Sequence, residues 1–268
     1  MRVDKVSGRA DLSAFVNLPF TLYRNDSNWV PPLKADVRKL LDENHHPFYD
    51  GGREAEIELF LARDGRQVVG RIAAILNHAH NRAHEENVGF FGFFETVQRP
   101  EVVNALLAAA EECAFERGHD AVRGPANPST NYECGLLVEG FDSPPVLMMT
   151  YNPPWYADLI EGAGYAKAKD LYAYISPVHD ASLERLKRLG ARAVRRNPGL
   201  TTRSADLKNF DTEVALIKEL YNAAWEKNWG FVPVSSAEFD ALAGELKDLV
   251  HPDLVRIALI DDEPVGFI

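Results

Sequence analysis

The chain has 268 residues, of which 46% are hydrophobic and 26% charged, so it is expected to fold around a real core and not to be disordered or fibrous. The 29 basic and 40 acidic side chains give a formal net charge of -11, which disfavours a nucleic-acid partner because phosphate backbones would be repelled. No apolar run approaches the ~20 residues that span a bilayer, and no signal peptide follows Met1, so we expect a cytoplasmic protein with no membrane partner.

The first half of the chain predicts a mixed arrangement of strands and helices. Four phenylalanines in one strand are expected to pack on both faces of a sheet, and Asp64-Gly65 predicts a tight hairpin. In chain order we predict a strand at 3–6, helices at 12–24 and 35–43, strands at 57–63, 67–76 and 87–95, a helix at 100–117, a strand at 121–123, a proline-broken loop at 124–131, a helix at 154–162 and a strand at 171–175.

The second half begins with a basic segment and then repeats the opening pattern. Residues 179–199 predict a solvated connecting helix, and Ser235 with Glu238 predicts a capping box before a helix. Beyond the connector we predict a strand at 200–207, helices at 212–227 and 239–249, and a hairpin that begins at 255–260. The expected domains are therefore 1–178, the connector 179–199, and 200–268.

An internal repeat relates the two halves. The dipeptide Asn-Trp follows the first helix of each half, at 28–29 and at 228–229. Four hairpin residues also align without a gap to four others: Ala62, Val69, Gly70 and Ile72 to Ala258, Val265, Gly266 and Ile268. We infer two copies of one domain and expect the second copy to be truncated after its first hairpin, as in a shortened gene.

Four segments give this chain a family resemblance: the hairpin 60–72, and the stretches NLPFTLYRND at 17–26, GFFGFFE at 89–95 and GPANPSTNYECG at 124–135. With the element order, they resemble the GNAT family of acyl-CoA-dependent N-acyltransferases, and in particular its uncharacterised bacterial tandem members. The resemblance implies a mixed α/β (α+β) GNAT-like fold in tandem. It also implies transfer of an acyl group from acetyl-CoA or another acyl-CoA to an amine.

In such proteins the pyrophosphate of CoA is held by backbone amides at the start of the helix expected at 100–117. Gln98 and Arg99 match the family's phosphate loop loosely. The loop here has no glycine, Pro100 lacks an amide donor, and Glu101 would oppose a phosphate. Gln98 and Arg99 are thus the candidate cofactor-binding residues, but these departures from the family's pattern argue against the first domain as the part that uses acyl-CoA.

The family's general acid is commonly a tyrosine on the helix expected at 154–162, and the matching position here is Ile160. Isoleucine cannot donate a proton. We expect the first domain not to perform acyl transfer, the second to carry it, and this chain alone to be inactive. The sequence does not name a catalytic residue.

Short polar side chains gather in the loops around 124–152. They could orient a small polar ligand, although Asn, Ser and Pro also build turns and satisfy local backbone groups. These candidate substrate-binding residues are Asn127, Ser129, Asn131, Glu133, Tyr151 and Asn152.

Histidines and cysteines are interpreted without a metal. His78, His80 and His84, followed by Glu85 and Glu86, match no standard zinc spacing, so we expect exposed loop histidines, as also for 45–46. The two cysteines, at 113 and 134, are expected to be buried free thiols.

Two functions remain open at this point. The first is an N-acetyltransferase-like enzyme that acylates a small-molecule amine, and the alternative is a non-catalytic GNAT-like binding or regulatory module. Aminoacyl transfer from charged tRNA ranks last because of the net charge of -11. The sequence predicts neither the acceptor, nor the acyl donor, nor the oligomeric state.

Overall fold

The computed structural model describes residues 1–175, 180–247 and 251–268. The chain divides into two compact units, residues 1–171 with 230–232, and residues 172–229 with 233–268. The expected boundary between 178 and 179 falls outside the described residues, and the three predicted domain ranges stay predictions.

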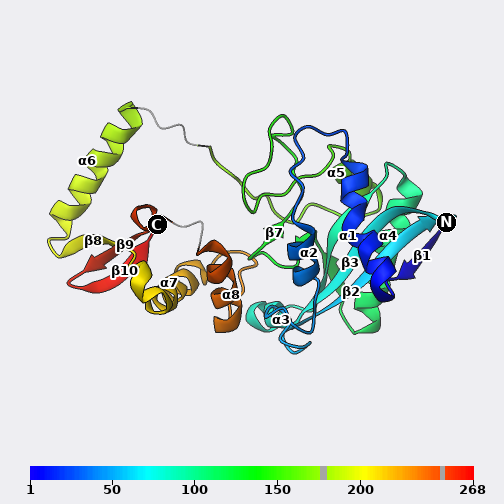
Figure 1. Ribbon diagram of the computed structural model, residues 1–268, viewed down its shortest axis with the longest axis horizontal. Helices are drawn as coiled ribbons and strands as arrows, with labels where there is room; N and C mark the ends of the chain where they lie inside the picture. The colour runs from blue at the N-terminus through cyan, green and yellow to red at the C-terminus, as the bar shows by residue number, and fades with distance from the viewer. Residues whose placement is uncertain (176–179, 248–250) are drawn as a thin grey trace. The chain divides into compact units, whose positions relative to one another are not determined.

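The first unit is built on one twisted sheet with the order β1-β2-β3-β4-β5 (Figure 1). All neighbouring strands are antiparallel except β4 and β5, which run parallel and pair only through the first three residues of β4. The strands are β1 Arg2–Lys5, β2 Ala55–Asp64, β3 Gln67–Asn77, β4 Val88–Thr96 and β5 Ala121–Arg123. This mixed order, with a helix between β4 and β5, is the GNAT-like fold that the resemblance implied.

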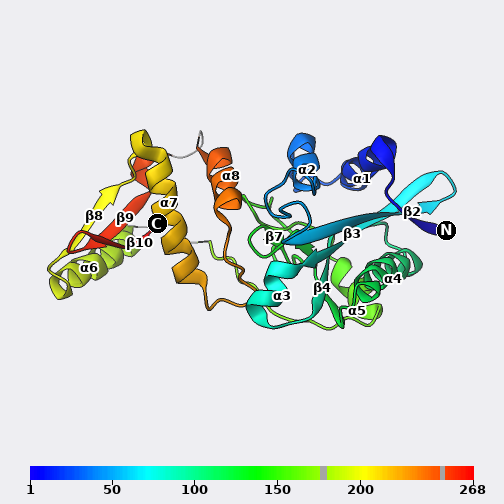
Figure 2. The same ribbon diagram turned by 90° about the horizontal axis from the view of Figure 1, so that it is seen from below.

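Helices cover both faces of this sheet (Figure 2). α1 (Gly8–Leu22) and α2 (Lys34–Leu40) lie on one face, and α4 (Pro100–Glu116) and α5 (Tyr156–Gly162) on the other. Each face has its own buried apolar cluster, because α1 and α4 each present an apolar stripe to the sheet.

A bulge in β4 decides which side chains point to which face. Phe90 and Phe93 belong to the cluster under α1, while Phe91 and Phe94 belong to the cluster under α4. Residues three apart cannot share a face in a regular strand, because side chains alternate. The pairing with β3 shifts at this point, and Phe93 adopts a positive φ of 49°. The bulge turns the end of β4 toward the helix ends.

Three expectations for the first unit are wrong. Residues 78–84 form helix α3 (His78–His84), because Asn77 caps it by accepting the N–H of His80. Within the loop expected at 124–131, β6 (Ala126–Asn127) pairs with β7 (Glu133–Cys134). No strand forms at 171–175, where the side chains are exposed.

The second unit contains a smaller sheet of order β10-β9-β8. Its elements are α6 Asp180–Arg196, β8 Leu200–Ser204, η1 Leu207–Asn209, α7 Phe210–Trp225, α8 Ser236–Leu246, η2 Pro252–Leu254, β9 Arg256–Ile260 and β10 Glu263–Phe267. The expected solvated connector is helix α6, whose described side chains are nearly all exposed. Ser235 caps α8 by accepting the N–H of Glu238 at 3.2 Å, as predicted. The end of the helix expected at 239–249 falls on residues that are not described.

The strand register confirms the repeat between the two hairpins. Ala62 pairs with Gly70 in the first hairpin, and Ala258 pairs with Gly266 in the second. In both hairpins the residue just before that glycine is left unpaired as a bulge. Each hairpin also pairs with a strand that precedes two helices, β1 in the first unit and β8 in the second. Shared irregularities of this kind are stronger evidence of duplication than the aligned letters alone.

A first prediction concerns the crossing of β4 by β6. A Cβ on Gly92 would lie 1.7 Å from the backbone oxygen of Ala126, so Gly92→Ala must push two strands apart. We expect it to lower the free energy of unfolding by roughly 3 kcal/mol or more, measured by urea unfolding. Gly162→Ala is the matched control, because its Cβ meets nothing within 4 Å, and it should change stability by less than about 0.5 kcal/mol. Equal effects of the two substitutions would contradict the close approach.

Candidate functional site

A carboxylate at the end of β4 is the centre of the candidate site. The hydroxyl groups of Tyr23 and Tyr156 donate hydrogen bonds to Glu95 Oε2 at 2.7 and 2.8 Å. Arg71 Nη2 lies 4.0 Å from Glu95 Oε1, too far for a hydrogen bond but close enough for strong attraction. Only 13% of the Glu95 side chain is exposed.

The fold brings these four side chains together from separate elements. Tyr23 caps the C-terminus of α1, and Tyr156 is the first residue of α5, so the two tyrosines approach from opposite faces of the sheet. Arg71 lies opposite Glu95 in the pairing of β3 with β4. The pairing of β5 with β4 ends at Phe90, the third residue of β4. The second half of β4 therefore has room for these groups on that edge.

Arg71 is buried and only partly satisfied. Its Nη1 donates to the backbone oxygen of Phe15 at 2.8 Å, and its guanidinium lies 4.8 Å from the centre of the Phe15 ring. Its Nε is buried and has no hydrogen-bond partner among the described residues. A buried donor of this kind indicates a place where a further polar group would be stabilised.

Burial dominates the protonation of the cluster. Desolvation raises the pKa of Glu95 above its usual value, although Arg71 and the two tyrosine hydroxyls act in the opposite direction. The pKa of Tyr23 is raised by burial and by the Glu95 charge, as is that of Tyr156, so both remain protonated donors. A carboxyl group with a raised pKa, held by two donors, accepts a proton more readily than an ordinary carboxylate does.

Aromatic rings and a second carboxylate extend the site toward solvent. Trp29 stacks on Tyr23 with ring centres 5.1 Å apart, and Tyr151 meets Tyr23 edge-on at 6.0 Å. The Tyr151 hydroxyl donates to Asp26 Oδ2 at 2.7 Å, and burial followed by this contact raises its pKa to about 12. Aromatic faces beside carboxylates favour a cationic ligand such as an ammonium group. We use the name Glu95 recess only for the set of residues in contact around this carboxylate: Glu95, Tyr23, Arg71, Tyr156, Trp29, Tyr151 and Asp26.

Three of the six candidate binding residues lie around this recess. Tyr151 is one of its residues, and Asn127 Oδ1 accepts the N–H of Phe93 at the bulge at 2.6 Å. Glu133 reaches solvent, but surrounding protein desolvates it and raises its pKa, and its charge contributes to the raised pKa of Glu95. The structure brings these three together, and no observation tests whether they bind substrate.

The side chains of the other three candidates form hydrogen bonds with nearby backbone groups, which is the alternative to ligand binding considered for these residues. Ser129 Oγ accepts the N–H of Asn131 at 3.2 Å, and Asn131 Nδ2 donates to the backbone oxygen of Val232 at 3.0 Å. Asn152 Oδ1 accepts the N–H of Leu137 at 2.7 Å. All three side chains are buried and are used for internal contacts.

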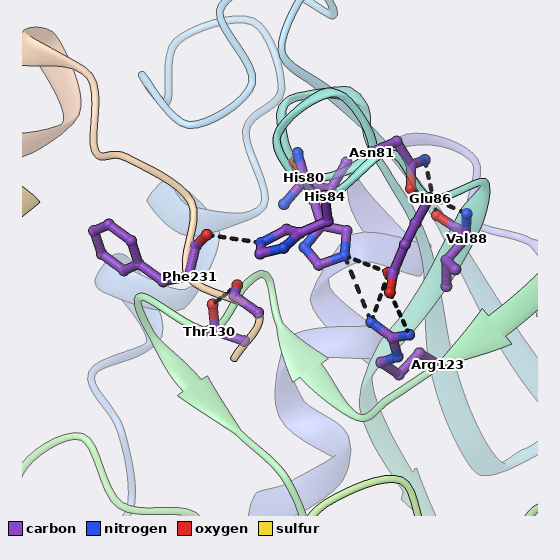
Figure 3. A network of polar contacts seen from close by, with 10 residues as sticks. His80, Asn81, His84, Glu86, Val88, Arg123, Thr130 and Phe231 are labelled. Carbon is purple, nitrogen blue, oxygen red and sulfur yellow. Dashed lines mark hydrogen bonds and ion pairs between the residues drawn. The ribbon is translucent and has the colours of Figure 1, made fainter. Parts of the chain in front are cut away.

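Helix α3 and the loop after β6 hold residues 230–232, which belong to the first unit (Figure 3). His84 Nε2 donates to the backbone oxygen of Phe231 at 2.8 Å, and Thr130 Oγ1 donates to that of Gly230 at 2.6 Å. Because a carbonyl only accepts, these contacts require the hydrogen on His84 Nε2.

A partly exposed ion pair lies next to His84, whose ring centre is 4.5 Å from that of His80. His80 Nε2 and Arg123 Nη1 both lie 2.9 Å from Glu86 Oε2 (Figure 3). His80 is buried, so the expectation of exposed loop histidines is wrong for this residue, and it is also wrong for His46. Helix α3 turns His80 inward toward Phe90, whose ring it meets edge-on.

Comparison with known proteins shows to which protein family the chain belongs. No family model matches the chain. The bacterial ceramide synthase of Caulobacter vibrioides is 37% identical over 271 residues, which cover 100% of this chain and 69% of that protein. Protein YghO of Escherichia coli is 36% identical over 258 residues, 96% of this chain and 65% of that protein. The chain belongs to the family of these proteins. It spans about two thirds of their length.

Two solved structures of acetyltransferases show a limited similarity to this family member. A tandem GNAT protein from the clavulanic acid biosynthesis pathway is 14% identical, with a TM-score of 0.48 over 99% of this chain and 73% of that one. An aminoglycoside acetyltransferase in complex with sisomicin is 14% identical, with a TM-score of 0.40 over 66% of this chain and 96% of that one. The GNAT-like assignment stands on the strand order and pairing described above.

The start of α4 does not fit the phosphates of CoA. Arg99 is bound to Asp64 at 2.8 Å and to Glu101 at 2.7 Å, so two carboxylates surround the one cation at this helix end. Gln98 is exposed beside them, and Pro100 offers no amide hydrogen. Ile160 is packed in the core under α4 and faces no site.

The remaining candidates of this family member are its possible metal ligands and its two cysteine thiols. Within 1–175, 180–247 and 251–268, no group of histidine, cysteine and carboxylate side chains could hold a metal ion. Cys113 is buried, and burial raises its pKa to about 11, which keeps the thiol protonated at neutral pH. Cys134 is half-buried, with a pKa raised for the same reason.

A second prediction concerns the ion pair beneath residues 230–232. The hydrogen bond from Arg123 is the main reason that the pKa of Glu86 falls to about 2. A lowered carboxyl pKa stabilises the folded state above pH 4.5, and this contribution is lost as the pH falls toward about 2. Glu86→Gln should therefore cost about 1 kcal/mol at pH 7, a value kept small because the side chain is 35% exposed and solvent screens it.

Urea unfolding of both proteins between pH 7 and pH 3 measures this effect. The difference between them should shrink as the wild-type carboxylate becomes protonated. Glu85→Gln is the matched control, since Glu85 is exposed and adjacent. A cost that is independent of pH, or an equal cost for the control, would contradict the role of the ion pair.

Proposed function

We propose that the complete protein is an N-acyltransferase that joins an acyl group to the amine of a long-chain amino alcohol, and that the Glu95 recess binds this amine. The observation that carries the proposal is the buried Glu95 carboxylate under two tyrosine hydroxyls. Family membership supports the substrate class, because a ceramide is the amide of a fatty acid with a long-chain amino alcohol and one relative is named a ceramide synthase.

The chemistry of the recess suits an amine. A primary alkyl amine has a pKa near that of lysine, roughly 10.4, so it arrives as an ammonium ion and must lose a proton before it can attack an acyl group. Glu95 can hold the ammonium by charge and then take its proton, a transfer that the raised carboxyl pKa favours. Tyr23 and Tyr156 fix the carboxylate in position, and Trp29 and Tyr151, which pack on Tyr23, add aromatic rings that favour a cation nearby.

The acyl donor is proposed to bind outside the first unit. The GNAT-like fold suggests an acyl-CoA, either acetyl-CoA or a longer thioester, but the start of α4 does not fit its phosphates. The thioester carbonyl must still reach the amine at Glu95, where the C–N bond forms as the C–S bond breaks and CoA leaves as the thiol, whichever part of the complete protein holds the phosphates of CoA. We therefore propose that the first unit supplies the amine site alone, that this chain by itself does not turn over, and that nucleic acid is not a partner.

The test is a product assay on the complete protein. A long-chain amino alcohol is incubated with acyl-CoA thioesters from acetyl to palmitoyl, and the amide is measured by mass spectrometry. Glu95→Gln should lower kcat by roughly 10²- to 10⁴-fold, because it removes the proton acceptor and leaves the shape. Tyr23→Phe should lower it less. Glu101→Gln, an exposed carboxylate at the start of α4, is the control and should leave kcat unchanged.

Each other outcome assigns a different role. If amide forms and Glu95→Gln turns over as fast as wild type, Glu95 is not the proton acceptor. If no amine is acylated with any thioester, the non-catalytic binding module becomes the better account. Thermal unfolding of each variant shows whether a loss of activity is a loss of fold.

A further inference from the structure

An exposed apolar turn lies in the long segment between β7 and α5, which has neither helix nor strand (Figure 1). Four consecutive apolar side chains are open to solvent there, Val146 at 71%, Leu147 at 74%, Met148 at 47% and Met149 at 42%. Contiguous apolar exposure of this kind is uncommon on a soluble surface and marks a contact site. We call residues 144–149 the apolar loop.

The backbone holds this loop in a defined shape. Pro144 and Pro145 are its first two residues, and the N–H of Met149 donates to the oxygen of Val146 at 3.0 Å. Met148 adopts a positive φ of 63°, a conformation that a residue with a side chain rarely takes. The turn is thus fixed with its apolar side chains outward, and an observed strain of this kind favours a functional explanation.

The loop is attached on both sides beside the Glu95 recess. After it, the chain reaches Tyr151, which packs on Tyr23 and donates to Asp26. Before it, the backbone oxygen of Phe141 accepts a hydrogen bond from Asn28 Nδ2 at 3.0 Å. Tyr23 in turn donates to the Glu95 carboxylate. The apolar loop is therefore linked on both sides to residues that surround Glu95.

We propose that the apolar loop inserts into the surface of a lipid bilayer and places the recess at the water–lipid boundary, where a long-chain amine enters with its amine first. The identity of this amine rests on the proposed function. A molecule with an ammonium head and a hydrocarbon tail resides at that boundary, so its tail can stay in lipid while its head reaches Glu95.

Charge near the loop favours neutral lipid. Glu139 and Asp142 precede the loop, Asp26 lies beside its end, and the chain carries a net charge of -11. Attraction to anionic headgroups therefore does not drive binding to the bilayer. The driving force is the transfer of the apolar side chains of the loop from water into lipid. Among the described residues every helix is too short or too polar to cross a bilayer. The sequence-based expectation of no membrane partner rested on spanning segments alone, which insertion of a loop does not need.

Flotation of the complete protein with phosphatidylcholine vesicles tests this inference. Wild type should bind, with little dependence on salt. The double variant Val146→Gln with Leu147→Gln should bind roughly tenfold less, because it removes the two most exposed apolar side chains. Phe115→Gln is the matched control, since Phe115 is 51% exposed on α4, and it should bind as wild type does.

Turnover supplies a second readout. The double variant should acylate a long-chain amine in vesicles more slowly, and a short water-soluble amine at the wild-type rate. The inference is overturned if wild type does not bind vesicles or if the double variant binds them equally well. It is also overturned if the double variant acylates both amines more slowly by the same factor while its vesicle binding is unchanged. Vesicle binding needs no acyl transfer, so this inference and the proposed function can fail independently.

Discussion

The burial of one carboxylate is the constraint on which the candidate site depends. Glu95 can remain at 13% exposure only because two tyrosine hydroxyls donate to it and Arg71 lies 4.0 Å away. Those partners come from the end of α1, the start of α5 and the middle of β3. Residues from both helix layers and from the sheet thus contact one charged group, Glu95.

The bulge in β4 makes that meeting possible. With a regular strand, Phe90 and Phe93 would point to opposite faces, and the pairing of Arg71 with Glu95 would shift by one residue. The first and second hairpins carry bulges at matching positions, so irregular backbone was copied with the rest of the fold. The recess, by contrast, depends on β4, α5 and the loops after β5, and belongs to the first unit.

Local patterns predicted the elements better than the site. Helical spacing predicted α4, turn chemistry predicted the first hairpin, and the repeat followed from aligned letters. Tyr151 was selected as a candidate, but Tyr23, Glu95 and Tyr156 were not, because their contacts join residues more than sixty positions apart. One signal was present, a single carboxylate that ends a strand of phenylalanines. Helix α3 was missed because histidine and asparagine have low helix propensity. The N-cap and the burial of one face of the helix, which stabilise it here, could not be recognised from the local sequence.

Equilibrium binding of a long-chain primary amine to the complete protein tests the central claim most directly, with the N-acetylated form of the same molecule as the uncharged comparison. The account predicts that wild type binds the amine and prefers it to the amide. It also predicts that Glu95→Gln weakens amine binding by about tenfold or more while amide binding stays constant, since only the amine carries the charge that Glu95 meets. Equal binding of the amine by both proteins would contradict it.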